Sequence, residues 1–104
     1  MTFEIRKEGK VIGVSELEFG DPPMGFVHGI FKPTEFYSPY VDKTGFQLFI
    51  SGTEDEIAND SIVIEDFSEG VGELLLEITI LVRSSADYKR FFKHHLDAYE
   101  KQFG

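Results

Sequence analysis

The chain has no cysteine. Its absence excludes disulfide bonds, cysteine-ligated zinc, iron–sulfur centres and catalysis by a thiol. Long apolar runs are also missing. The longest, residues 74–82, is interrupted by Glu77 and Thr79 and is far shorter than the ~18 residues that a membrane helix needs. Residues 1–8 carry charges with no apolar run behind them, so no signal peptide is expected. These absences predict a soluble protein of a reducing compartment such as the cytoplasm, although a small chain without cysteine is also compatible with secretion.

Positive charge is missing from one long segment. Residues 44–82 contain nine acids and no Lys, Arg or His, whereas the rest of the chain holds ten acids and ten bases. The net charge of −9 is therefore the charge of this segment alone. A field of one sign repels nucleic acid and anionic membranes and attracts cationic partners. Nucleic acid and membranes are accordingly not expected as partners.

The remaining composition indicates one folded domain spanning residues 1–104, because 41% of the residues are hydrophobic and eleven are Phe. Alternation of apolar and polar residues predicts strands, and Gly and Pro separate them. The strands are predicted at residues 3–7, 11–19, 26–31, 46–51, 62–67 and 73–82. Turns are expected at 8–10 and 20–23, and an acidic loop at 52–60. We expect these strands to form one mainly antiparallel sheet of five or six strands.

The end of the chain changes to a helical period. Ser84 or Ser85 is suited to cap a helix, and Ser84 with Asp87 three residues later has the form of a capping box. Apolar residues then recur at spacings of four and three, which predicts one amphipathic helix. The members of this stripe are Tyr88, Phe92, Leu96, Tyr99 and Phe103, flanked by Phe91 and His95. Strand 73–82 has one purely apolar face, and we expect the helix to pack on it. The predicted fold class is therefore α+β, with one C-terminal helix on one face of the sheet.

The second face of strand 73–82 is mixed, with Glu73, Leu75, Glu77, Thr79 and Leu81 sharing it. An acidic, partly apolar sheet face is suited to binding a protein, because the charge steers the partner and the apolar residues hold it. The residues predicted to bind a basic partner are Glu54, Asp55, Glu56, Glu65, Glu73 and Glu77. The other interpretation is that the negative charge only keeps a Phe-rich domain in solution.

A second candidate site surrounds the Pro22-Pro23 corner, whose fixed backbone and flanking glycines would make a rigid lip. The other interpretation is an ordinary turn between strands. His28 follows on a strand and would pair with Asp21 as base and orienter, but no nucleophile accompanies them. A lone His on an apolar face is more often a core residue. The residues of this alternative ligand-binding or enzymatic site are Asp21, Met24, His28, Tyr37 and Tyr40. We predict no catalytic set from the sequence.

No cofactor or metal site is predicted. His94 and His95 are adjacent on the predicted helix and point about 100° apart, so they cannot hold one ion together. The acidic residues 54–60 lack the alternating ligands, central Gly and closing Glu of a calcium loop. No glycine-rich phosphate loop precedes a helix.

The segment Gly-Asp-Pro-Pro-Met-Gly at 20–25, followed by Gly29-x-Phe31-x-Pro33, resembles a group of small uncharacterised bacterial proteins. The resemblance covers roughly residues 11–40. It implies a bacterial source and brings no activity with it. By analogy of class, small acidic α+β proteins of bacteria include immunity proteins that neutralise basic toxins.

The leading hypothesis is a non-enzymatic protein-binding module whose acidic sheet face engages a basic protein, as an immunity-type inhibitor would. The first alternative is a small-ligand or enzymatic site at the Asp21/His28 corner. The second is a structural subunit that self-associates through its aromatic helix or an edge strand.

Overall fold

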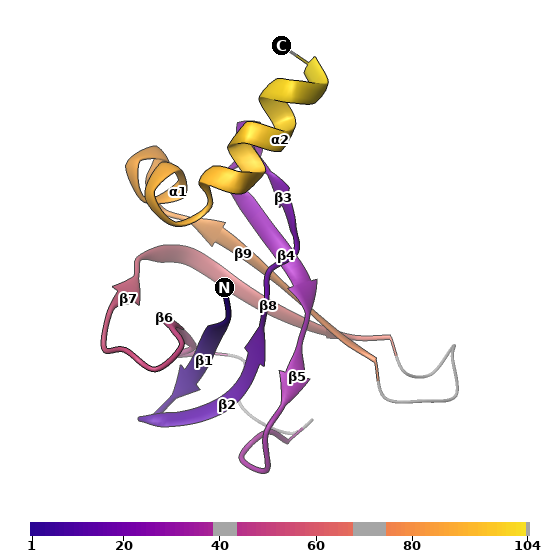
Figure 1. Cartoon of the computed structure of the whole chain (residues 1–104). Coiled ribbons are helices and arrows are strands. Elements are labelled where there is room, and N and C mark those ends of the chain that lie inside the picture. The colour runs from indigo at the N-terminus through magenta and orange to yellow at the C-terminus, as the bar shows by residue number, and fades with distance from the viewer. Residues whose placement is uncertain (39–43, 68–74, 104) are drawn as a thin grey trace.

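The computed structural model describes residues 1–38, 44–67 and 75–103. In these residues the chain is α+β, with two antiparallel sheets and two helices at the C-terminal end (Figure 1). The five-stranded sheet has the order β5-β2-β1-β6-β7, and the four-stranded sheet has the order β3-β4-β9-β8. The strands are β1 (Phe3–Lys7), β2 (Lys10–Ser15), β3 (Phe19–Asp21), β4 (Phe26–Ile30), β5 (Lys32–Pro33), β6 (Gln47–Ile50), β7 (Glu56–Ile57), β8 (Asn59–Asp66) and β9 (Leu76–Val82). The helices are α1 (Ser85–Phe91) and α2 (Lys93–Phe103), and a short 3-10 helix, η1 (Pro22–Met24), follows β3.

The prediction of a single sheet was wrong, because the chain changes sheets where one continuous strand was expected. The predicted strand 11–19 divides into β2, which pairs with β1, and β3, which pairs with β4 in the other sheet. Between them Leu17 adopts a left-handed backbone with φ of 46°, which is uncommon for a residue other than Gly. Its side chain is fully buried, and its N–H donates to Ser15 Oγ at 3.1 Å. The apolar residues change parity at this crossing, from Ile12 and Val14 to Leu17 and Phe19, a shift that the prediction of one continuous strand did not take into account.

The hairpin of β1 and β2 confirms the expected turn, in which Glu8 and Gly9 both have positive φ, as in the tight turns that match strand twist. Two other boundaries differ from expectation. The expected loop 52–60 contains β7 and the start of β8. The predicted strand 26–31 is followed by β5, which contains Pro33 at the margin of the five-stranded sheet, where a missing N–H is tolerated.

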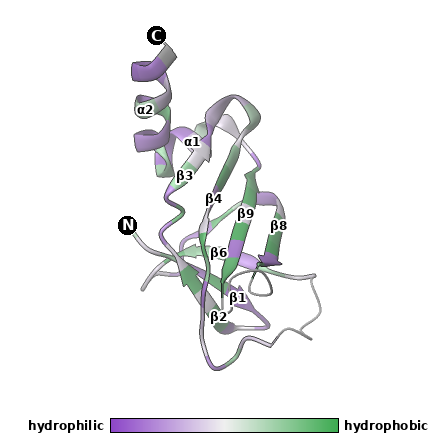
Figure 2. Ribbon diagram, turned by 90° about the vertical axis from the view of Figure 1, so that its right-hand side faces the viewer, coloured by the Kyte–Doolittle hydropathy of each residue, from purple (hydrophilic) through white to green (hydrophobic). Residues whose placement is uncertain are grey.

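The core lies between the two sheets. The apolar face of β9 is buried as predicted, but the five-stranded sheet covers it together with aromatic side chains of the helix region. The residues that face each other across this core include Phe3, Ile5 and Leu48 of one sheet and Val27, Ile78 and Ile80 of the other, all at most 1% exposed. In Figure 2, β4 and β9 are mainly hydrophobic, as strands next to the core should be, whereas α2 is mainly hydrophilic.

The predicted single helix is two helices. The predicted cap is confirmed, since Ser84 Oγ accepts a hydrogen bond from the Asp87 N–H at 3.1 Å. The helical path breaks at Phe92, whose φ of −128° and ψ of 34° lie outside the helical region. α2 then contacts β3 and η1 and extends beyond the sheets (Figure 1), so Tyr99 on the predicted apolar stripe is 37% exposed.

Tyr88 ties α1 to the four-stranded sheet. Its side chain is buried, and its O–H donates to the carbonyl oxygen of Phe26 at 2.9 Å. Burial, together with the nearby carboxylate of Asp21, raises the pKa of Tyr88 from 10.0 to about 12. The folded protein therefore favours the neutral phenol more strongly than the unfolded chain does.

This pKa predicts an alkaline loss of stability. Below pH 10 the phenol is neutral in both states and its contribution is complete; as the pH rises from about 10 to about 12, the unfolded chain ionises first and about 2 kcal/mol is lost. The Tyr88→Phe variant should be about 1 kcal/mol less stable at neutral pH, because the hydrogen bond is missing, but should lose less on alkalinisation. Urea unfolding of both proteins across this range measures the difference. Parallel stability curves would contradict the assignment.

Candidate functional site

One face of the four-stranded sheet points away from the core, and we call it the open face. The hydrogen-bonded register places its residues in rows across the strands. Ile30, Glu77 and Glu65 form the first row, Phe19, His28, Thr79 and Val63 the second, and Asp21, Phe26, Leu81 and Ser61 the third. Phe67 donates its N–H to the Leu75 carbonyl at 2.9 Å and extends the face beyond the strand ends. Every one of these residues is at least partly exposed.

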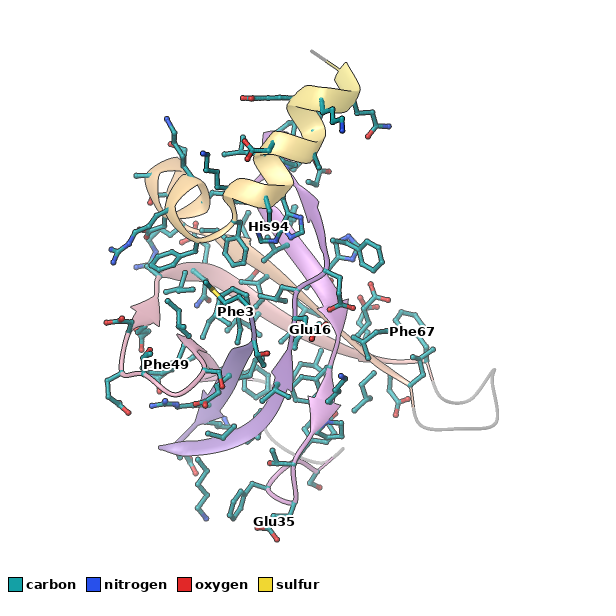
Figure 3. All side chains as sticks on the ribbon, viewed as in Figure 1. Phe3, Glu16, Glu35, Phe49, Phe67 and His94 are labelled. Carbon is teal, nitrogen blue, oxygen red and sulfur yellow. The ribbon has the colours of Figure 1, made fainter. Side chains whose placement is uncertain are left out.

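Large apolar side chains stand exposed on the open face. Phe19 is 56% exposed, Val63 47%, Phe67 45% and Ile30 39%. Figure 3 shows Phe67 at the outer margin of the four-stranded sheet, whereas Phe3 lies in the interior next to the helices. Apolar side chains that share one surface in this way are typical of protein interaction sites.

Two carboxylates lie side by side among these apolar groups. Glu65 is the direct cross-strand partner of Glu77, an arrangement of like charges that destabilises a sheet. Nδ1 of His28 lies 3.4 Å from Glu77 Oε1, and the His28 ring stacks on Phe19 with 5.3 Å between ring centroids. No Lys or Arg occurs in the three rows that the structure describes. The described rows of the open face therefore carry negative charge with no Lys or Arg to offset it.

The residues predicted to bind a basic partner do not form one surface. Glu65 and Glu77 lie together on the open face. Glu54, Asp55 and Glu56 are exposed at the β6–β7 connection of the other sheet, and β8 then carries the chain ~20 Å further before it reaches Glu65. The remaining predicted residue, Glu73, lies outside the described residues.

Glu54 is paired with Arg6 within the chain. Nη1 of Arg6 donates to both carboxylate oxygens of Glu54 at 3.1 and 3.2 Å, and Nη2 donates to Glu4 at 2.9 Å and to the Thr53 carbonyl at 2.8 Å. The backbone N–H of Gly52 donates to Glu4 and, with the Arg6 guanidinium, holds the pKa of Glu4 below its usual value. Arg6 thus fastens the 51–55 turn to β1, and Glu54 serves this contact.

The Asp21 corner also differs from its prediction. Asp21 and His28 share the open face on neighbouring strands, so the expectation of a buried His28 was wrong; its side chain is 37% exposed. Met24 is 62% exposed on η1, on the other side of the corner. Tyr37 packs edge-on against the core residue Phe31, with 5.4 Å between ring centroids, and Tyr40 lies outside the described residues. Of the four described residues of this set, only Asp21 and His28 share a surface.

Two grooves flank this corner. The first, of about 350 Å³, includes Met24 and the ion pair of Arg83 with Asp60 at 3.0 Å. The second, of about 580 Å³, runs between β3 and α2, and its lining includes Glu18, Phe19, Asp21, His28, His95 and Tyr99.

The sequence places His95 as a half-buried neighbour of the apolar stripe, but the structure makes it central to the second groove. His95 is 8% exposed, and its Nε2 donates to the Leu17 carbonyl at 2.8 Å. Gly20 allows this approach, because a Cβ at that position would lie 2.6 Å from Cγ of His95. In the sequence, only the glycine in the strand, Gly20, together with the histidine in the helix, His95, could have suggested this close contact.

Among the described residues, no three His, Asp or Glu side chains are placed to hold a metal ion. Neither helix in the described part of the chain has the length and apolar character to cross a membrane. No family model, curated protein or solved structure matches the chain. The open face and the grooves are therefore the evidence from which a function can be argued.

Proposed function

We propose that the chain is a non-enzymatic protein-binding module that holds a basic protein on its open face. The observation that carries the proposal is the direct pairing of Glu65 with Glu77 between exposed apolar side chains. A like-charge pair opposes the stability of the isolated sheet. A cationic side chain from a partner would relieve this repulsion, so the pair favours the bound state over the free one.

The open face offers both kinds of contact that a protein interface uses. A Lys or Arg of the partner would lie between the two carboxylates, and an Arg would bind them with two parallel hydrogen bonds. Phe19, Ile30 and Val63 would lose their exposed area to the partner's apolar groups. The net charge of −9 would steer a basic protein toward the complex at low salt.

An immunity-type inhibitor is the form of this function that we propose for a bacterial cell. Such a protein neutralises a toxin by covering its basic surface, and it needs an exposed acidic face rather than a catalytic site. The small size, the negative charge and the open face of the chain support this form by analogy with the class of small acidic immunity proteins.

The test is capture of partners from a lysate of the source cell, with the tagged protein at about 0.05 M and about 0.5 M salt. We expect one basic protein in near-equal amount at low salt, lost at high salt and lost with the Glu65→Gln/Glu77→Gln variant. The matched control is Glu35→Gln/Glu100→Gln, which removes the same charge at two exposed sites away from the open face. Equal capture by all three proteins would reject the proposal.

The groove between β3 and α2 supports a second candidate function, the binding of a small organic cation. Carboxylates of Glu18 and Asp21 and rings of Phe19 and Tyr99 line it, and such a combination attracts cations. Its described lining contains no Ser, Thr or Lys for a base to activate, so binding rather than catalysis is proposed.

Free arginine is a suitable probe for this groove. In a ¹⁵N NMR titration we expect the amide of Gly20 to shift with saturation in the wild type and to shift several-fold less in Asp21→Asn. Glu35→Gln is the matched control and should behave as the wild type does. Shifts that never saturate, or that are equal in Asp21→Asn, would exclude a site here.

A further inference from the structure

The four-stranded sheet ends at β8, which has β9 on one side and no strand on the other among the described residues. The opposite margin of the sheet is covered. There β3 lies under α2, and beyond β3 the N–H of Ile30 donates to Glu18 Oε2 at 3.3 Å. Natural sheets usually protect such margins, because unpaired N–H and C=O groups accept another strand. The eight residues of β8 are the longest strand of the chain as described.

The register shows which groups of β8 face outward. Phe67 donates its N–H to Leu75, so the odd-numbered residues of β8 bond to β9. The hydrogen bonds of β9 on its other side are consistent with this. Val82 donates its N–H to the Gly25 carbonyl, so the even-numbered residues of β9 bond to β4. The N–H and C=O groups of Ile62 and Ile64 consequently point to the outer margin, where no hydrogen bond within the described residues reaches them.

The start of this margin borders open space. A hollow of about 280 Å³ lies beside Asn59, Asp60, Ser61 and Ile62, with Gly45 and Phe46 on its other side. The hollow thus adjoins one of the two residues whose backbone groups point outward.

We propose that β8 accepts an extended basic strand of the partner protein, which joins the sheet as a fifth strand. The inference rests on the proposed function and specifies how the partner binds. An added strand would enlarge the open face, with Lys or Arg on the face that it shares with Glu65 and apolar residues opposite Ile62 and Ile64 on the other face. Its cation would then lie beside the Glu65–Glu77 pair. Glu65 and Asp66, with Asp60 whose charge Arg83 offsets in part, give the margin the acidic character that selects a basic strand.

The same charges oppose pairing with a second copy of this chain. If two β8 strands paired antiparallel with Ile62 opposite Ile64, Asp60 would face Asp66 of the second copy, and symmetry would repeat this contact. Like charges directly opposite destabilise a strand pair. A second copy of the chain is therefore not the partner that we propose for this margin.

The probe is an eight-residue peptide of alternating Lys and Val, and its control is the Glu and Val peptide of the same length. Amide hydrogen exchange of the full chain, read by NMR, is the measurement. We expect the Lys and Val peptide to slow exchange of the Ile62 and Ile64 amides by roughly tenfold or more, because each gains an acceptor. The Val63 amide already bonds to β9 and should change little, and the Glu and Val peptide should have no effect.

A proline substitution tests directly whether the outward backbone N–H of Ile62 binds the peptide. Ile62→Pro removes the outward N–H but no bond to β9, whereas Ile62→Ala shortens the same side chain and keeps the N–H. We expect the proline variant to bind the Lys and Val peptide roughly tenfold more weakly than the alanine variant. Equal affinities would overturn strand addition.

The remaining outcomes separate this inference from the proposed function. Peptide binding that is lost in Glu65→Gln/Glu77→Gln but leaves amide exchange at Ile62 and Ile64 unchanged would overturn strand addition and retain the open face as the binding site.

Slow exchange of both amides in the free monomer would show that the chain itself covers the margin, and would also overturn strand addition. Protection that rises with protein concentration would assign the margin to a second copy. Absence of binding to the Lys and Val peptide at low salt would count against both proposals.

Discussion

Replacing Glu65 and Glu77 together with lysine should slow association with the basic partner by roughly a hundredfold at low salt and remove most of its salt dependence. The two carboxylates are direct cross-strand neighbours on the open face, so the change reverses the charge at the point where the partner's cation would lie. Stopped-flow or surface-based association rates at several salt concentrations measure the effect. Glu35→Lys/Glu100→Lys changes the net charge equally and should slow association far less, because steering also depends on where the charge lies.

The single and double variants separate binding from stability. Glu65→Lys alone places opposite charges across β8 and β9, so we expect the free energy of unfolding to rise by about 0.5 kcal/mol while binding weakens. The double variant restores a like-charge pair and should lose that gain. A protein that becomes more stable as it binds less well is the signature of a surface kept for a partner. If Glu65→Lys is destabilised, or if both variants associate at the wild-type rate, the open face is not the binding site.

Replacing Phe92 with alanine should lower the free energy of unfolding by about 3–5 kcal/mol, a large part of the stability of a domain this size. Phe92 is fully buried where the helical path breaks, with its ring 5.1 Å from Phe3, 5.6 Å from Tyr88 and 6.2 Å from His95. These contacts join both helices to β1.

Urea unfolding followed by circular dichroism measures this loss, and Tyr99→Ala is the matched control. Tyr99 is an aromatic residue of the same predicted stripe but is 37% exposed, so its removal should cost about 1 kcal/mol or less. Similar costs for the two variants would mean that the break at Phe92 is not the point where the helices attach to the sheets.

Local features of the fold were predictable from the sequence. The turn at Glu8 and Gly9 and the capping of α1 by Ser84 depend on residues within a few positions of each other. Strict alternation over residues 76–82 predicts one buried and one exposed face, and the structure has both. Glu77 was therefore identifiable as a residue of an exposed face.

Contacts between distant segments were not predictable in the same way. The shift of apolar parity between Val14 and Leu17 marks an irregularity but does not say which strand the next segment joins, and the left-handed Leu17 has no signature in its residue type. The stripe from Tyr88 onward predicts a helix but not the break at Phe92, whose ring packs against Phe3 of the distant strand β1. The contacts of Glu54, Glu65 and Glu77 likewise depend on segments that are distant in the sequence.

The sequence by itself determined the fold class, the acidic segment 44–82 and the alternating faces of the strands, because these depend on composition and on short-range period. Only the tertiary structure decided which acids are available. Strand pairing brings Arg6 to Glu54, 48 residues away, and offsets the charge of that acid. It also brings Glu65 opposite Glu77 and leaves β8 at a margin of its sheet. Register between strands sets both outcomes, and register depends on the packing of the whole core.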